Sequence, residues 1–140
     1  MVYASEADII ELYGELALLD TLADPVNDRL TAVPKAIASA SAEIDAYLSA
    51  RYRVPLASAP AVLVRPAIDI TLYVLASAHT RLTDELRKRY EDAIAFLARL
   101  STGRAGLGAD EPRVDDGAGG QTSGAAFEAQ PRLFGRGRGL

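Results

Sequence analysis

His79 is the only histidine in the 140-residue chain, and the chain contains no cysteine. Zinc sites and catalytic triads need a second imidazole, a thiolate or a nucleophile beside the histidine. Because the sequence offers His79 no such partner, we interpret it as a side chain at a helix end or in a loop. The lack of cysteine also excludes a disulfide scaffold and thiolate chemistry.

Two groups of acidic residues could suggest a cation site. Asp24, Asn27 and Asp28 lack the alternating spacing of an EF-hand loop, and Arg29 stands where that loop needs glycine. We therefore interpret the first group as turn residues. The second group, within residues 110–116, lies in glycine-rich sequence. A solvated loop is our interpretation there, with loose binding of a divalent cation as the alternative.

A pair of opposite charges within an apolar stretch is the sharpest polar feature. Arg65 and Asp69 are four residues apart, so on a helix they share one face and can pair. We expect a structural ion pair inside the helical body, because buried charges are usually paired. The alternative is a buried switch or an interface lock.

The elements that would position these residues are helical. Ser5, followed three residues later by Asp8, predicts a capped helix over residues 6–13 that ends at Gly14. Residues 15–30 are rich in turn-forming residues, which predicts a loop and a turn.

Two further helices are predicted from apolar side chains that recur every three or four residues. One has its cap at Thr31 or Ala32, carries Pro34 in its first turn, and ends before Pro55. The other is capped by Thr83 and is closed by a glycine.

Between these two helices, residues 61–78 are almost wholly apolar. As a helix they would reach only about 27 Å, and they contain two charges and Pro66, so we predict a central buried helix rather than a membrane span. Pro66 is expected to kink this helix or to mark its start. Four helices with short links predict an all-α fold, a small four-helix bundle.

The chain divides at Gly103. Ten of the eleven glycines lie at or after this residue. We therefore predict a helical body over residues 1–102 and, over residues 103–140, a long, glycine-rich, extended C-terminal arm that cannot offset its own ordering entropy. The body carries 10 basic and 14 acidic residues and the arm five of each, so the net charge of −4 lies on the body.

The arm ends in the sequence PRLFGRGRGL. An apolar Leu-Phe pair between arginines is typical of a segment that docks on a partner protein. The candidate partner-binding residues of the arm are Phe127, Arg132, Leu133, Phe134, Arg136 and Leu140. Arginine and glycine together could also contact nucleic acid, an alternative that the acidic charge of the chain disfavours.

Two runs, SAEIDAYLSARYRVPLA at residues 41–57 and RKRYEDAIAFLARLSTGRAGLG at residues 87–108, carry a family resemblance. With the opening YASEADI and the PRLF of the arm, they make the chain similar to the Mu-like prophage family of small head–tail connector proteins. The resemblance covers nearly the full length. It implies an α-helical neck adaptor that assembles as a ring beneath the portal of a tailed bacteriophage or prophage.

The resemblance also implies the partners of such an adaptor. They are the portal protein, neighbouring copies in a homo-oligomeric ring that matches a dodecameric portal, and a stopper or tail-terminator protein. Genomic DNA would pass through the lumen without sequence-specific binding, because acidic groups repel phosphate. The expected location is the neck of the virion, after synthesis in the host cytoplasm.

We therefore expect a structural subunit rather than an enzyme, with no catalytic residue, cofactor or metal. The N-terminus has no basic region typical of a signal peptide, and we expect no membrane partner. Two alternatives remain open. One is a stopper, or head-completion, ring in the same neck, and the other is a small nucleic-acid-binding regulator with an arginine- and glycine-rich tail.

Overall fold

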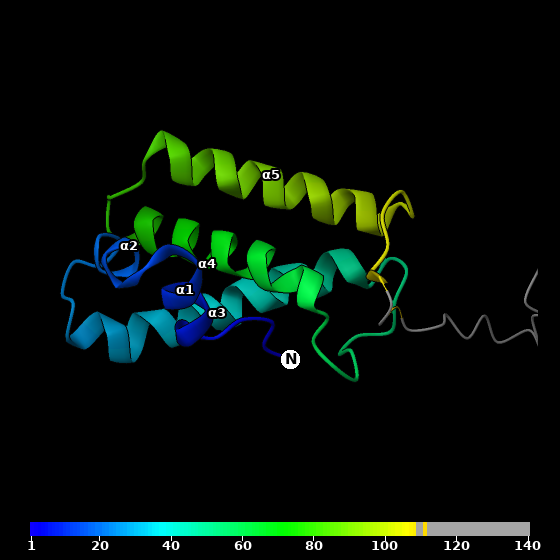
Figure 1. Ribbon diagram of the computed structural model, residues 1–140, viewed down its shortest axis with the longest axis horizontal. Coiled ribbons are helices and arrows are strands. Elements are labelled where there is room, and N and C mark those ends of the chain that lie inside the picture. Colours follow the sequence, from blue (N-terminus) through cyan, green and yellow to red (C-terminus); the bar gives the residue numbers. More distant parts are fainter. Residues whose placement is uncertain (109–110, 112–140) are drawn as a thin grey trace, which may run out of the picture.

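The computed structural model of the protein describes residues 1–108 and residue 111. This part of the chain is helical, as predicted, but it contains five α-helices rather than four, together with one short 3-10 helix (Figure 1). In chain order these elements are α1 (Glu6–Tyr13), α2 (Glu15–Leu19), α3 (Asn27–Leu48), η1 (Ala61–Leu63), α4 (Val64–Ala78) and α5 (Asp84–Ser101).

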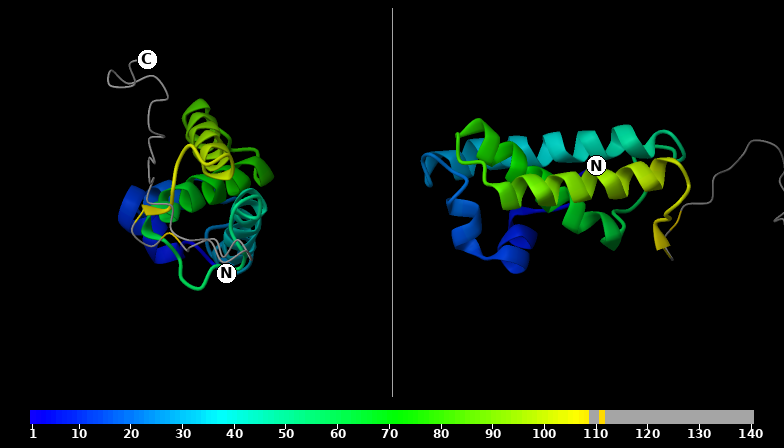
Figure 2. Two further views of the ribbon diagram at one scale, coloured as in Figure 1. Left: turned by 90° about the vertical axis from the view of Figure 1, so that its right-hand side faces the viewer. Right: turned by 90° about the horizontal axis from the view of Figure 1, so that it is seen from above.

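The three long helices lie side by side and form the main body. In Figure 1, α4 lies between α3 and α5, and it packs against both of them. The short helices α1 and α2 pack against each other beside the long helices, near the start of α3 (Figure 2), and α1 also contacts α4. The guanidinium of Arg29 on α3 pairs with Glu6 of α1 and with Glu15 of α2, which ties this corner together.

The core is built around α4. Every residue from 66 to 72 is buried, so this helix is covered on all sides. The stretch Ala61–Ala78 is long and apolar enough to cross a membrane by length and composition, but 56% of it is buried inside the molecule. Pro66 lies in the first turn of α4, just after η1, where its missing N–H costs no helical hydrogen bond. It therefore marks the start of the helix and does not kink it.

The caps predicted for the first and the last helix are confirmed. The Ser5 hydroxyl accepts from the backbone N–H of Asp8 while the Asp8 carboxylate accepts from the backbone N–H of Ser5, which forms a capping box. The Thr83 hydroxyl accepts from the N–H of Leu86 at 3.2 Å and caps α5. Gly14 and Gly103 follow α1 and α5 with φ of 89° and 80°, a left-handed region that favours glycine.

The prediction of a loop over residues 15–30 is wrong in two places. Glu15–Leu19 forms α2, and α3 begins at Asn27, several residues before the predicted cap at Thr31 or Ala32. The carboxylate of Asp24 accepts from the N–H groups of Val26 and Asn27, so it satisfies donors at the helix start that would otherwise face water.

Pro34 lies in the interior of α3 rather than in its first turn, as a consequence of the earlier start. Proline cannot donate to the carbonyl four residues before it, which belongs to Leu30. Both Pro34 and Leu30 are exposed, so water can hydrate that carbonyl. The helix therefore continues past Pro34, which lies on its solvent-exposed face.

The packed body extends beyond residue 102. Leu107 is buried and joins the core, and Glu111 is held by contacts to the body. The predicted arm is thus described only at residues 103–108 and 111; its other residues, 109–110 and 112–140, lie outside the described part.

We predict that Leu97→Ala lowers the free energy of unfolding by about 2–5 kcal/mol, because Leu97 is fully buried on α5 and its truncation leaves a cavity. Urea unfolding followed by circular dichroism measures this loss. The control Leu16→Ala removes a leucine that is 76% exposed and should change stability by less than about 0.5 kcal/mol. Equal losses in the two variants would contradict the described core.

Candidate partner-binding surface

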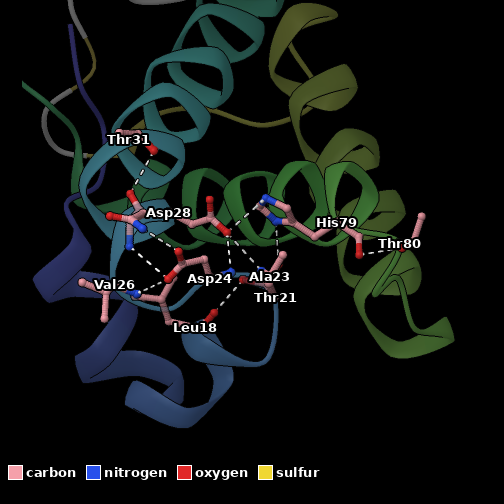
Figure 3. A network of polar contacts seen from close by, with 10 residues as sticks. Leu18, Thr21, Ala23, Asp24, Val26, Asp28, Thr31, His79 and Thr80 are labelled. Carbon is pink, nitrogen blue, oxygen red and sulfur yellow. Dashed lines mark hydrogen bonds and ion pairs between the residues drawn. The ribbon is translucent and has the colours of Figure 1, made fainter.

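His79 is the C-terminal cap residue of α4, and it connects this helix end to the segment before α3 (Figure 3). Its Nδ1 lies 2.9 Å from the backbone carbonyl oxygen of Thr21, and its Nε2 lies 3.5 Å from the Asp28 carboxylate. The same carboxylate accepts from the N–H groups of Ala23 and Asp24 at 3.1 and 2.7 Å. These contacts hold the α2–α3 connection in place, which is a structural role.

Asp24 has the turn role predicted for it (Figure 3), whereas Asn27 and Asp28 are the first two residues of α3. The Asn27 side-chain amide donates to the Asp24 carboxylate at 2.6 Å, in addition to the two backbone donors described above. These hydrogen bonds lower the pKa of the Asp24 carboxyl. Within residues 1–108 and 111, no three His, Asp or Glu side chains gather as a metal site would require. Of the second acidic group, only Glu111 is described.

The expected direct ion pair between Arg65 and Asp69 is not formed. No nitrogen of Arg65 lies within 4.0 Å of the Asp69 carboxylate among the ion pairs of the described residues. Arg65 is exposed in the first turn of α4, whereas Asp69 is buried one turn later. The Asp69 carboxylate instead accepts from the Tyr13 hydroxyl of α1 at 2.6 Å.

A pocket of about 370 Å³ lies between α4 and α5 beside this hydrogen bond. Its wall carries Arg65, Asp69, Arg89 and Asp92 around an apolar surface. The guanidinium of Arg89 lies 4.3 Å from the centre of the Tyr13 ring, which is a favourable cation–π distance. Arg89 also pairs with Glu85, as the spacing of four residues on one helix allows.

Burial raises the pKa of the Asp69 carboxyl above its ordinary value, because the charged form loses hydration. The hydrogen bond from Tyr13 and the charges of Arg65 and Arg89 act in the opposite direction. The pKa of Tyr13 is also raised, first by burial and then by its bond to Asp69. Arg65 and Arg89 thus stabilise the charged form of Asp69 without touching it, and Tyr13 makes the direct contact.

Arg51 binds the segment that follows α5. Its guanidinium donates to the backbone carbonyls of Leu100 and Ala105 at 3.4 and 3.3 Å, and it lies 3.7 Å from the Glu111 carboxylate. The Tyr52 hydroxyl donates to the same carboxylate at 2.6 Å. A positive charge at the C-terminal end of a helix is favourable, so Arg51 both caps α5 and holds Glu111 against the body.

Tyrosine–carboxylate hydrogen bonds recur elsewhere in the fold. Tyr3, before α1, donates to Asp45 of α3, and Tyr90 of α5 donates to Glu43 of α3 at 2.9 Å. The ring of Tyr90 is stacked on that of Tyr73, with the ring centres 3.9 Å apart. Burial, followed by the Glu43 hydrogen bond, raises the pKa of Tyr90 to about 12. Each of these bonds joins two different segments.

Exposed apolar side chains concentrate near the N-terminus. Among the described residues, seven large hydrophobic side chains are exposed, and six of them lie within residues 1–30. They are Met1, Val2, Leu12, Leu16, Val26 and Leu30. The seventh is Val62, at η1. We call these six residues, which are carried by the chain before α1, by α1 and α2, and by the start of α3, the N-terminal apolar surface.

The structure brings together part of the predicted site and leaves the rest undescribed. Arg65 and Asp69 line one pocket without direct pairing. The candidate arm residues Phe127, Arg132, Leu133, Phe134, Arg136 and Leu140 lie outside the described residues.

Sequence reasoning missed Tyr13 as the partner of Asp69 and Arg51 as the partner of Glu111. These pairs are 56 and 60 residues apart, so no local spacing indicates them.

Residues 3–125 match the model of the family described as "Bacteriophage Mu, Gp36", and the chain therefore belongs to this family of phage proteins. The chain is 35% identical over 139 residues to the Mu-like prophage FluMu protein gp36 of Haemophilus influenzae, covering 97% of this chain and 94% of the relative. It is also 30% identical over 76 residues to gene product J of Escherichia phage Mu, covering 54% of this chain and 52% of that protein.

We predict that Asp69→Asn and Asp69→Ala differ in stability, because Asn keeps the hydrogen bond from Tyr13 and removes only the buried negative charge, whereas Ala removes both. The raised pKa means that the stability contributed by Asp69 is present when it is protonated and is lost as pH rises through that pKa. Asp69→Asn keeps an acceptor for Tyr13 without the buried charge, so at pH 7 it should be at least as stable as the parent, and this advantage should shrink toward pH 4. Asp69→Ala should lose about 1–3 kcal/mol.

Urea unfolding at pH 4 and pH 7 measures both variants. If Asp69→Asn lost as much stability as Asp69→Ala at pH 7, the negative charge itself would be the stabilising feature, and the Tyr13 assignment would be contradicted.

We predict that the fold loses stability as pH rises from 10 toward 12. An ordinary tyrosine titrates near 10, whereas Tyr90 in the fold titrates at about 12, so its protonated form stabilises the native state and that contribution is lost through this window. Urea unfolding at pH 8, 10 and 11 measures the loss. The loss should be smaller in Tyr90→Phe; an identical pH dependence in this variant would contradict the role of Tyr90.

Proposed function

We propose that the protein is a structural head–tail connector subunit of a tailed bacteriophage or prophage, an adaptor that forms a ring beneath the portal. Membership of the Mu Gp36 family supports a phage role. The resemblance of residues 41–57 and 87–108 to small head–tail connector proteins supports this particular role. The fold is in keeping with it, since α3, α4 and α5 form a helical body with its own core.

The observation that carries the proposal is the N-terminal apolar surface. Leu16, Val26 and Leu30 are 76%, 72% and 75% exposed, although the body has enough apolar side chains elsewhere to close its core. Single exposed leucines are common, but six exposed large apolar side chains within the first 30 residues are more than a small domain usually leaves uncovered, and such apolar area favours contact with another protein. In a head-to-tail ring this surface would meet a different surface of the next subunit.

Charge supports the same proposal. The net charge of the chain is −4, and its helical body carries the excess of acidic residues. Acidic groups on the lumen of a ring would repel DNA phosphates and let the genome pass without adhering. A regulator that binds nucleic acid would instead need a basic surface.

Electron microscopy of the purified full-length protein, alone and with the portal protein of the same phage, tests the proposal. We expect ring-shaped class averages and a complex with the portal, and only weak DNA binding in a shift assay. Binding to a portal–adaptor complex but not to the portal alone would identify the stopper instead. A monomer that ignores the portal and binds DNA with a steep salt dependence would overturn the proposal.

We predict that deleting residues 127–140 abolishes ring or portal assembly and leaves the helicity of the body intact, because the described core ends at Leu107. Circular dichroism checks the helicity, and light scattering coupled to size exclusion measures assembly. Assembly equal to that of the full chain would contradict a role for the arm.

A further inference from the structure

A groove of about 380 Å³ lies between α1 and the start of α4. Leu12 of α1, Ala61 of η1 and Val64 of α4 give it an accessible apolar surface, while Asp8 and Glu11 place two carboxylates on its α1 side. Leu12 is 45% exposed and belongs to the N-terminal apolar surface. The groove therefore combines apolar contact area with a local excess of negative charge.

The two acidic residues of the groove are available for a cationic ligand. Hydrogen bonds from Ser5 lower the pKa of Asp8, so this carboxyl stays ionised at neutral pH. Glu11 is exposed, and it joins none of the ion pairs found among residues 1–108 and 111. One arginine, Arg65, also lines the groove, which leaves the excess of charge negative. The α4–α5 pocket differs, because its two arginines balance its two aspartates.

The chain contains a segment whose chemistry complements this groove. Residues 131–136 read PRLFGR and place the apolar pair Leu133-Phe134 between Arg132 and Arg136. Leu133 and Phe134 could cover Leu12, Ala61 and Val64 while the flanking guanidiniums pair with the carboxylates. The charged pairs would then determine which residue of the segment lies at which position of the groove.

We propose that the groove between α1 and α4 binds residues 131–136 of a neighbouring copy of this chain. This inference rests on the proposed function, since it supplies the contact that links subunits of the ring head to tail. The length of the chain allows it. Glu111 is held at Arg51 and Tyr52, and the 21 steps from residue 111 to residue 132 span up to about 70 Å when extended, enough to reach an adjacent subunit.

Two full-length variants test whether the contact is between copies. The groove variant is Glu11→Lys with Leu12→Lys, and the arm variant is Arg132→Glu with Phe134→Ala. Each variant alone should remain monomeric by light scattering coupled to size exclusion. Mixed, they should form a 1:1 complex, because the groove variant still supplies an arm and the arm variant still supplies a groove. A mixture that stays monomeric would overturn the contact between copies.

A matched control is Glu91→Lys with Ala95→Lys, which makes the same change of charge at exposed positions of α5. This variant should assemble as the unmodified chain does. Circular dichroism confirms that every variant is folded, which is expected because Glu11 and Leu12 are exposed surface positions.

A labelled peptide of residues 128–140 provides a second measurement that does not depend on ring formation. Its fluorescence polarisation should show saturable binding to the full-length arm variant, and the affinity should fall at least tenfold when the groove changes are added. The α5 control changes should leave the affinity unaltered. Equal affinity for the intact and altered grooves would overturn the groove as the binding site.

The outcomes separate this inference from the proposed function. If the unmodified chain forms rings and binds the portal while peptide binding is insensitive to the groove changes, the connector proposal stands and the groove assignment is false. If the peptide binds the groove but the chain neither forms rings nor binds the portal, the groove assignment stands and the connector proposal fails.

Discussion

The burial of α4 is the constraint on which the rest of the structure depends. Residues 66–72 are buried without interruption, so α4 needs apolar partners on all sides, and α3, α5 and α1 supply them. A helix that is apolar all round is stable in water only inside other elements. This requirement places α1 against the first turns of α4 and so creates the groove between them.

The same burial determines where the polar bonds of the fold must lie. Asp69 is the only charged residue within the buried stretch of α4, and it needs a partner that reaches it from another element. Tyr13 provides that partner by donating a phenolic hydrogen bond from the last residue of α1. A tyrosine buries a large apolar ring and delivers a hydroxyl at its tip, so it suits the boundary between core and surface.

Three other tyrosines make the same kind of hydrogen bond to a carboxylate. Tyr3, Tyr52 and Tyr90 each donate to a carboxylate on a different segment. They join the N-terminus to α3, the end of α3 to Glu111, and α5 to α3. The bond of Tyr3 fixes the chain just before α1, which forms one side of the groove, and the bond of Tyr52 fixes Glu111, from which the distance to residues 131–136 is counted.

Local features of the fold could be predicted from the sequence, and contacts between distant residues could not. Ser5, Thr83, Gly14 and Gly103 act through neighbours within a few residues, so their caps and stops follow from spacing. The predicted start of α3 is too late for two reasons. Proline favours the first turn of a helix, so Pro34 indicated a start near residue 31, whereas the Asp24 carboxylate caps a helix that begins at Asn27.

In the candidate site, too, local spacing was predictable and long-range contacts were not. The spacing of Arg65 and Asp69 correctly placed them on one face of α4, but the direct partner of Asp69 lies 56 residues away on α1. The groove depends on the packing of two helices, for which a single sequence carries no local signal.

Hydrogen–deuterium exchange of the full-length protein, compared before and after assembly, tests the central claim most directly. If the body around α4 is self-contained, the amides of residues 67–78 should exchange most slowly in both states. Residues 8–12 and 131–136 should gain protection only on assembly. Equal protection of those two segments in the unassembled chain would contradict a body that is complete alone and joined to its neighbours through the arm.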